Sequence, residues 1–569
     1  MCWPSTGASE VQSQAFDWNS ILTEVGVRHH QLYHQLEQAE FADVISRFRS
    51  GLDPFATLSN YLIYGAAAVL GRDQQASNRA LAYHARLNTK TKAVSLYFWA
   101  EEAVAHQQYQ TADGLVSPLL EAYPQDPFLN AIMATSCFYS RQLPRGWPYV
   151  RQGLESAPKH KGLNSLLCRY LLGDGDLAGA QEAARELLDI DPYDPVALNT
   201  LSRVAPDTIE AHHLERFEYR ALDGSLGPVT SAGIYFDLGR VYEARRDYDR
   251  AFDAVSRANK QMKTIPAVSG QTFDAAQEYD QFKEQAALFD QLEPCSQPTG
   301  LKPIFIVGLP RTGSTLLDQA LSAHPGTVGL GETEIIPRIT GEATDLLKKG
   351  RVTDAQRRLR VWKAQFTDHA RRKAAELTGA GVPARPIRFV VDKMLGNSRN
   401  LGFLAKLFPE AVFLNSRRDL MDVGLSIFFS PLHRANLYAT DLEAIGDYMA
   451  LEARVMTFWA QRGVVAKPVQ YETLVGAFEP TLRQVMEHAG MDWHEDCLKF
   501  HQLKRPVYTY SAHQVRQKIY RQSIKRWQHY ESQLEPLAAT LRADGLIPGA
   551  GEVISLAEAR QAGLAQLSY

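Results

Sequence analysis

Apolar and polar positions follow a helical pattern through the first half of the chain, where Ala, Leu, Glu and Gln are abundant. The pattern changes in the second half, where short apolar runs rich in β-branched residues appear between helical stretches. The first run, residues 303–308, is suited to a buried parallel strand. This change predicts a multidomain chain, with an all-α solenoid followed by an α/β domain around a central parallel sheet.

The helical half contains a repeat with a period of 34 residues. Prolines recur at this period, and a small residue stands twelve positions before each of them. The prolines are Pro124, Pro158 and Pro192, and the small residues are Ala112, Gly146 and Ala180. A small residue lets paired helices approach closely, and proline suits the start of the next pair. The pattern resembles tetratricopeptide repeats, and a later copy contains Tyr235, Leu238, Gly239, Tyr242 and Ala251.

The helical pattern stops near residues 292–300, which hold two prolines and a glycine. We therefore predict degenerate helical repeats in residues 1–92, tetratricopeptide-like repeats in 93–290, a linker in 291–302 and the α/β domain in 303–569. Two roles for the repeats stay open. They form a concave surface that holds a protein or peptide, or they serve as a scaffold that joins two copies in a homodimer.

Composition limits the possible partners. A net charge of −3 over 569 residues gives no general attraction for nucleic acid, so any anion site must be local. The five cysteines are far apart and form no CxxC pair, which argues against a disulfide framework or a zinc site and favours a reducing, cytoplasmic location. No signal peptide and no membrane span are expected, because no basic start precedes an apolar run and no apolar stretch approaches about 18 residues.

A tight loop follows the first predicted strand and leads into an amphipathic helix. Its spacing, Gly308-x4-Gly313, is that of a nucleotide-binding P-loop, but Ser314 stands where such loops have lysine. A phosphoryl-transferring loop uses that lysine and magnesium against a multiply charged phosphate. A sulfuryl group carries less charge, so Arg311 with hydroxyl and main-chain donors suffices without a metal. The alternative is an ordinary strand-to-helix turn capped by a hydroxyl.

Residues 310–315 resemble the phosphosulfate-binding loop of sulfotransferases, especially the tyrosylprotein branch and its bacterial relatives with tetratricopeptide repeats. The resemblance extends to about Trp527 through several separated motifs. It implies 3′-phosphoadenosine-5′-phosphosulfate (PAPS) as donor, adenosine 3′,5′-bisphosphate (PAP) as product and no metal. It also implies that one group of residues holds the 5′-phosphosulfate. These are Arg311, Thr312, Gly313, Ser314 and Thr315.

Two further motifs supply the chemistry that the resemblance implies. Glu332 matches the family's catalytic base, and a carboxylate suits an acceptor hydroxyl that must lose its proton. Lys393 follows the predicted strand 389–392 and matches a lysine that stabilises charge on the transferring group, with Arg311 as the second cation. The alternatives are a solvated loop glutamate and an Asp392–Lys393 surface pair.

The remaining matches concern the nucleotide. Arg418 and Ser426 have the spacing of the family's 3′-phosphate motif, and Ser511 is assigned to the same phosphate. Tyr471 matches the tyrosine at the adenine, although a core aromatic is the alternative. Arg526 belongs to a basic C-terminal stretch that matches a loop closing over the nucleotide.

One departure concerns the acceptor. The tyrosylprotein enzymes of animals carry two arginines that recognise acidic peptides, and here Glu334 replaces the first while Arg338 retains the second. A protein tyrosine is therefore one acceptor, and a glycan, lipid or small phenol stays open. The other functional hypotheses are an ATP-dependent P-loop kinase, disfavoured by the missing lysine, and a repeat adaptor that carries an inactive nucleotide fold.

Overall fold

A computed structural model of the chain describes residues 40–50, 52–87, 89–224, 226–265, 272–378, 386–432, 436–502, 519 and 523–548. The chain divides into two compact units, Met1–Ala205 and Pro206–Tyr569. The described part of the first unit is helical, with α3 (Phe41–Ser50), α4 (Leu58–Leu70), α5 (Gln74–His84), α6 (Thr89–Ala105), α7 (Tyr109–Ala122), α8 (Pro127–Tyr139), α9 (Leu143–Ser156), α10 (Lys161–Asp174), α11 (Leu177–Ile190) and α12 (Pro195–Val204).

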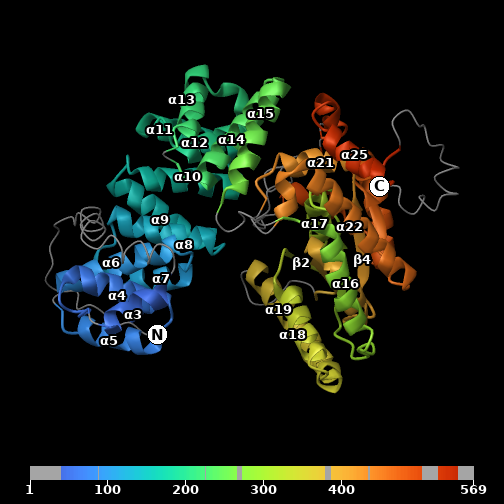
Figure 1. Ribbon diagram of the computed structural model, residues 1–569, viewed down its shortest axis with the longest axis horizontal. Coiled ribbons are helices and arrows are strands. Elements are labelled where there is room, and N and C mark those ends of the chain that lie inside the picture. The colour runs from blue at the N-terminus through green and yellow to red at the C-terminus, as the bar shows by residue number, and fades with distance from the viewer. Residues whose placement is uncertain are drawn as a thin grey trace. The chain divides into compact units, whose positions relative to one another are not determined.

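Helices α6 to α12 pack as successive pairs, and this solenoid confirms the predicted helical repeat (Figure 1). The repeated small residues lie at the fourth position of α7, α9 and α11. Ala112 and Ala180 are fully buried. At Gly146 a Cβ atom would come within 1.7 Å of the Tyr170 hydroxyl oxygen, so any side chain would push the two helices apart.

The turns between pairs contain a second 34-residue period that complements the prolines. Asp126, His160 and Asp194 each stand directly before the next helix, and each side chain accepts a hydrogen bond from its first turn. Such caps satisfy main-chain donors that have no partner inside the helix. The repeat prolines stand three residues before that helix and not at its first position; the carbonyl of Pro124 accepts from Asn130 Nδ2 at 2.8 Å.

The second unit contains the sheet and more helices. Its elements are η1 (Pro206–Thr208), α13 (Ala211–Leu222), α14 (Pro228–Ala244), α15 (Tyr248–Lys263), α16 (Ala275–Phe289), β1 (Lys302–Val307), α17 (Ser314–Ser322), β2 (Thr327–Gly331), α18 (Ile335–Lys348), α19 (Val352–Thr378), β3 (Phe389–Asp392), η2 (Leu395–Asn400), α20 (Leu401–Leu407), β4 (Val412–Arg417), α21 (Leu420–Phe428), η3 (Leu437–Thr440), α22 (Leu442–Gln461), β5 (Lys467–Gln470), α23 (Tyr471–Gly476), α24 (Phe478–Ala489), η4 (Glu495–Gln502), η6 (Arg526–Tyr530) and α25 (Glu535–Ala543).

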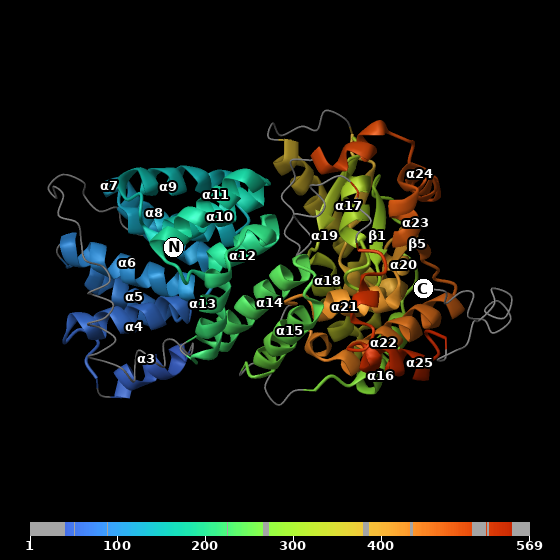
Figure 2. The same ribbon diagram turned by 90° about the horizontal axis from the view of Figure 1, so that it is seen from above.

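The described strands form one parallel five-stranded sheet in the order β2-β3-β1-β4-β5. Strands β1 and β5 are labelled in Figure 2, with helices of the same unit around them. Alternate residues of β1 enter different cores. Phe305 and Val307 pack with helices that include α16, α19 and α22, whereas Ile304 and Ile306 pack with α17 and α24. The sheet is therefore covered on both faces, which explains its continuous apolar runs and confirms the predicted α/β domain.

The strand order predicts where a ligand binds, and we call that part of the sheet its functional edge. The chain moves from β1 to β2 and β3 on one side and then to β4 and β5 on the other. Ligands of such sheets bind at the carboxyl ends of the strands where this order reverses, which here is beside β1. The loop of residues 308–313 leaves β1 at that edge.

Two helices of the last repeat copy, α14 and α15, lie in the same compact unit as the sheet. They approach closely at Gly239, where a Cβ atom would lie only 2.6 Å from Val255 Cγ2. Residues of the predicted linker, Leu292 and Cys295 among them, are buried in the core beside the sheet. The domain bounds derived from the repeat pattern remain a prediction.

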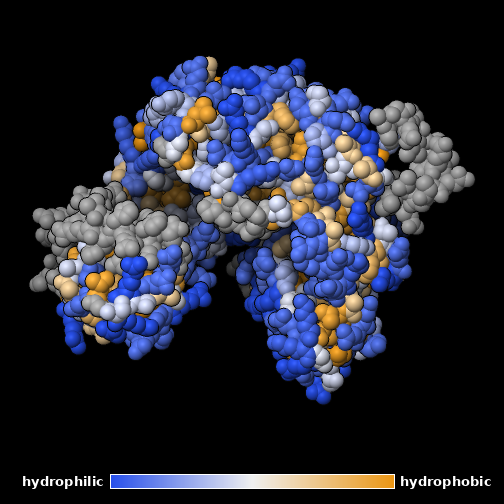
Figure 3. Space-filling model, in the orientation of Figure 1, coloured by the Kyte–Doolittle hydropathy of each residue, from blue (hydrophilic) through white to orange (hydrophobic). Residues whose placement is uncertain are grey.

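The surface shown in Figure 3 is mostly hydrophilic, with apolar residues scattered across it. Within the described ranges no helix combines the length and the apolar character that crossing a membrane requires.

Candidate nucleotide and sulfuryl-transfer site

The loop between β1 and α17 has a left-handed backbone at two positions, and both are glycines. Gly308 and Gly313 have φ angles of 121° and 85°. A Cβ atom at Gly308 would lie 2.7 Å from Asn415 Oδ1, and one at Gly313 would lie 2.4 Å from Tyr471 Cδ2. Both positions therefore lack room for a side chain as well as having a left-handed backbone. The loop then delivers the chain to the N-terminus of α17, where main-chain N–H groups favour an anion.

The hydroxyl residues of this loop and of the first turn of α17 are buried. Thr312, Ser314 and Thr315 have exposed fractions of 2%, 5% and 7%. The Thr312 hydroxyl donates to the carbonyl oxygen of Leu309 at 2.9 Å, and the Ser416 hydroxyl donates to the carbonyl of Thr312 at 3.1 Å. These bonds fix the loop to the end of β4, so the helix N-terminus has a defined position.

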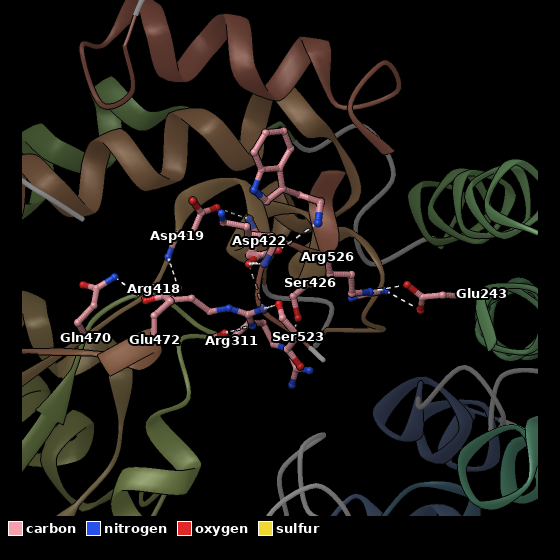
Figure 4. Close-up of polar contacts among 12 residues, drawn as sticks. Glu243, Arg311, Arg418, Asp419, Asp422, Ser426, Gln470, Glu472, Ser523 and Arg526 are labelled. Carbon is pink, nitrogen blue, oxygen red and sulfur yellow. Dashed lines mark hydrogen bonds and ion pairs between the residues drawn. The ribbon is translucent and has the colours of Figure 1, made fainter. Parts of the chain in front are cut away.

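Arg311, Arg418 and Ser426 meet beside the loop, as the close-up shows (Figure 4). The Nε of Arg311 donates to Ser426 Oγ at 3.0 Å, and Nη1 of Arg418 donates to the carbonyl of Arg311 at 3.2 Å. The guanidinium carbon of Arg418 lies 4.9 Å from the centre of the Tyr471 ring. Residues that are 160 positions apart in the sequence, Arg311 and Tyr471, thus belong to one cluster.

Asp422 is the counterion of Arg418. Their side chains, 0% and 8% exposed, form an ion pair at 3.7 Å. Arg418 also donates to the carbonyl of Ser523, and Asp422 accepts from the main-chain N–H groups of Lys525 at 2.7 Å and Trp527 at 3.1 Å. The segment 523–527 is therefore fastened to Arg418 and to the first turn of α21. A buried pair with these additional bonds holds its geometry well.

The turns after β4 and β5 are joined by Glu472. Its two carboxylate oxygens accept from the main-chain N–H of Asp419 at 3.0 Å and from Gln470 Nε2 at 2.7 Å. The Asp419 side chain in turn caps α21. This connection fixes the spacing between Arg418 and Tyr471, which lie on the two turns. Burial raises the pKa of Tyr471, so its hydroxyl stays protonated at neutral pH.

The ends of β2 and β3 bring Glu332 and Lys393 together. Gly331 is in register with Asp392, and the main-chain N–H of Lys393 donates to the carbonyl of Gly331 at 2.9 Å. The Lys393 ammonium forms an ion pair with Glu332, the lysine side chain being 2% exposed and the glutamate 45%. A buried cation thus lies beside a carboxylate that solvent can reach, at the functional edge of the sheet.

Comparisons with known proteins bear on the same residues. Residues 303–495 match the model of a family described as the sulfotransferase family. Over this segment the chain is therefore similar to that family. The match begins at β1 and includes the loop, both ion pairs and Tyr471, but it ends before the segment 523–527.

Individual relatives cover only part of the chain. An uncharacterized protein of Aquifex aeolicus is 26% identical over 411 residues, 69% of this chain and 52% of its own length. Protein-tyrosine sulfotransferase 2 of Gallus gallus is 28% identical over 209 residues, 35% of this chain and 54% of its own. Protein-tyrosine sulfotransferase 1 of Homo sapiens is 32% identical over 119 residues, which are 20% of this chain and 31% of its own length. The chain thus spans about half the length of the first two.

A solved structure, the sulfotransferase domain of the Synechococcus PCC 7002 olefin synthase, covers 47% of this chain and 95% of its own. Its TM-score is 0.29 at 16% identity, an overlap too low to support a detailed comparison.

Of the two predicted residues in the basic stretch, the structure describes Arg526 but not Ser511. Arg526 forms an ion pair with Glu243 of α14, and its guanidinium carbon lies 4.9 Å from the centre of the Phe429 ring. Contact of these two residues with the nucleotide remains a prediction, as do the roles assigned to the other site residues of the α/β domain.

Sequence reasoning missed Asp422, Ser523, Glu472 and Asp392 as parts of the site. Asp422 has only a weak signal, since it stands four positions after Arg418, but Arg418 precedes α21 and the two do not share a helix face. Ser523 acts through its main-chain carbonyl, so its side chain carries no signal. Within the described ranges no group of three or more His, Cys, Asp and Glu side chains is placed to hold a metal ion.

Asp392 is an acid buried within the α/β domain. Its Oδ1 accepts from the N–H of Met394 at 3.0 Å and from Asn397 Nδ2 at 3.1 Å, whereas the buried Oδ2 has no hydrogen-bond partner among the described residues. Complete burial raises the pKa of this side chain from 3.8 to about 7. Below that pH the folded protein therefore holds a proton that an unfolded chain releases near pH 4.

The raised pKa of Asp392 predicts that the stability of the protein depends on pH. Between about pH 4 and 7 the folded state binds more protons than the unfolded state, so the Asp392 contribution falls as pH rises and is lost above pH 7. Asp392→Asn mimics the protonated acid. We expect the variant to gain stability relative to the parent as pH rises from 5 to 8, by a few kcal/mol (about 1.4 per pKa unit). Melting temperatures of both proteins at the two pH values measure this, and a constant difference would contradict it.

Proposed function

We propose that this chain is a sulfotransferase that transfers a sulfuryl group from PAPS to a hydroxyl acceptor. The observation that carries the proposal is the meeting of Arg311, Arg418 and Ser426 at the loop before α17. The ion pair of Glu332 and Lys393 at the same edge of the sheet supports it. The match of residues 303–495 to the sulfotransferase family supports the same reaction class.

The residues present fit a nucleotide that carries two phosphate groups. The helix N-terminus and Arg311 suit the 5′-phosphosulfate. Arg418, with Ser426, suits the 3′-phosphate. Arg418 is 7% exposed, and its Nε makes no hydrogen bond with the described residues. A buried donor without a partner costs free energy that a bound anion offsets.

The donor supplies an activated sulfuryl group and a bisphosphorylated leaving group. In our proposal Glu332 takes the proton of the acceptor hydroxyl as its oxygen bonds to sulfur. Lys393 and Arg311 stabilise the negative charge that grows on the oxygen between sulfur and the 5′-phosphate as that bond breaks. The exposure of the two side chains supports this division of roles, because Glu332 is solvent-accessible and Lys393 is buried.

A hydroxyl on a protein tyrosine is the acceptor that the names of the two vertebrate relatives support. Recognition of acidic flanking residues has less support. Arg338 is held by Glu342 at 2.7 Å and by Gln365 at 3.1 Å, and Glu334 adds a negative charge nearby in sequence. We therefore propose a tyrosine without an acidic flank, and a glycan, lipid or phenol would be a different outcome of the same assay.

Calorimetry on the full chain tests the nucleotide site. We expect PAP to bind at least about tenfold more tightly than ATP with Mg²⁺, and labelled sulfate from PAPS to reach an acceptor in a panel of peptides, glycans and phenols. Gly313→Ala forces a side chain into Tyr471 at a left-handed position. This variant is expected to weaken PAP binding by about tenfold or more.

Tighter binding of ATP with Mg²⁺ would favour the kinase hypothesis and contradict the proposal. PAP binding without transfer to any acceptor class would favour the adaptor hypothesis. Gly341→Ala is the matched control, because Gly341 lies in α18 and an added Cβ atom would meet nothing within 4 Å, so this variant should bind PAP as the parent does.

A further inference from the structure

Helix α15, which pairs with α14, packs directly against the helix that carries Ser426. Phe252 of α15 stacks on Phe428 at the end of α21, with ring centres 5.4 Å apart. Asn259, which is 3% exposed, donates from Nδ2 to the carbonyl of Phe428 at 2.9 Å. This bond satisfies a carbonyl at the C-terminus of α21. The repeat helices therefore complete a helix of the proposed nucleotide site.

Glu243 of α14 also binds the segment beyond the family match. Its carboxylate accepts from Nε and Nη2 of Arg526, the second at 2.8 Å, and from the hydroxyl of Tyr530 at 3.2 Å. The side chains of Glu243 and Arg526 are only 22% and 23% exposed. A bidentate contact of this kind fixes the orientation of the guanidinium group as well as its distance from the carboxylate. Next to it, the rings of Tyr248 and His529 stack at 4.3 Å.

The other side of the same segment determines how Arg418 lies. The carbonyl of Ser523 accepts from Arg418, and Asp422 joins Arg418 to the main chain at Lys525 and Trp527. The anchor on α14 and the contacts to Arg418 are thus separated by only a few residues. Figure 4 shows Glu243 and Arg526 on one side of this group and Arg418 on the other.

We infer that Glu243 is a positioning residue for the proposed 3′-phosphate site, acting through Arg526 and the segment 523–527 on Arg418. The inference rests on the proposed function, because Arg418 is assigned to the phosphate there. It assigns Arg526 to holding this segment, and it makes α14 and α15 part of the nucleotide-binding unit.

Removing the charge of Glu243 has a predictable consequence. Arg526 loses its counterion, and the segment 523–527 is held on one side only. Arg418 then adopts more orientations, and ordering it again on binding costs free energy. The loss of affinity should concern the 3′-phosphate. The described hydrogen bonds of the Glu243 carboxylate go to Arg526 and Tyr530, and none goes to the loop of residues 308–313 that suits the 5′-phosphate.

Calorimetry on full-length Glu243→Gln with two ligands tests the inference. PAP and adenosine 5′-monophosphate differ by the 3′-phosphate, so the ratio of their affinities reports that group alone. We expect this ratio to fall by about tenfold, whereas the affinity for the monophosphate stays within about twofold of the parent. Lys263→Gln is the matched control, since it breaks another ion pair of α15, with Asp441 at 2.9 Å, and should leave the ratio unchanged.

A second variant separates positioning from loss of folding. Arg526→Gln should lower the ratio by a similar factor, and the double variant should be no worse than either single one, because both changes break the same link. An unchanged ratio in Glu243→Gln, or effects that multiply in the double variant, would overturn the inference. A parent chain that binds neither nucleotide would overturn the proposed function and this inference together. If the parent and Glu243→Gln bind PAP equally, only this inference is overturned.

Discussion

Glu332→Gln is expected to lower the turnover of sulfuryl transfer by about 10²- to 10⁴-fold, the usual contribution of a general base. The glutamine keeps the shape of the side chain and can still accept a hydrogen bond from Lys393, but it cannot take the acceptor proton at neutral pH. Its position, 45% exposed beside a buried ammonium, suits a base that meets an incoming hydroxyl. Steady-state rates with labelled PAPS and a fixed acceptor measure the change.

The same variant should bind PAP within about threefold of the parent, because the phosphates are assigned to other residues. Asp345→Asn is a suitable control, as it removes an exposed carboxylate from the helix that follows Glu332. Unchanged turnover in Glu332→Gln would remove this residue from the role of base. A parallel loss of PAP affinity would instead indicate that the site has lost its fold.

Lys393→Met should lower turnover by about 10²- to 10³-fold, with little change in the acceptor concentration that gives half the maximal rate. Methionine fills a similar volume but carries no charge, so the leaving oxygen loses its stabilisation. The lysine side chain is 2% exposed, and bulk water therefore cannot replace the ammonium. The comparison of the two kinetic parameters distinguishes charge stabilisation from acceptor binding.

Melting temperatures provide the control for this variant. Glu332 stays half exposed and solvated when its partner is removed, so Lys393→Met should cost only about 1 kcal/mol or less of stability. A variant that retains its fold and full turnover would contradict the catalytic role. A variant that melts many degrees lower would show that the buried ammonium serves the fold.

Local patterns in the sequence predicted the architecture well, for identifiable physical reasons. The small residues Ala112, Gly146 and Ala180 predicted helix pairs because close packing leaves little choice of residue. The run at 303–308 predicted a central strand because a sheet covered on both faces needs continuous apolar residues. The caps at Asp126, His160 and Asp194 were equally visible in the sequence, and their period repeats that of the prolines.

The supporting contacts of the site could not be predicted in the same way. Glu243 and Arg526 are 283 residues apart, and neither has a neighbour in the sequence that indicates its partner. The carbonyl of Ser523 belongs to the main chain, which every residue type offers. Motifs thus identified the residues assigned to the ligand, whereas the contacts that hold those residues in place depend on tertiary packing.

The packing of α15 on α21 also affects how the protein can be divided. A hybrid that grafts the α/β fold onto a foreign partner at residue 303 would discard Phe252 and Asn259 and leave the end of α21 uncovered. A junction at Pro206 keeps both helices with the strands they serve. A hybrid protein should therefore include the last repeat together with the α/β fold.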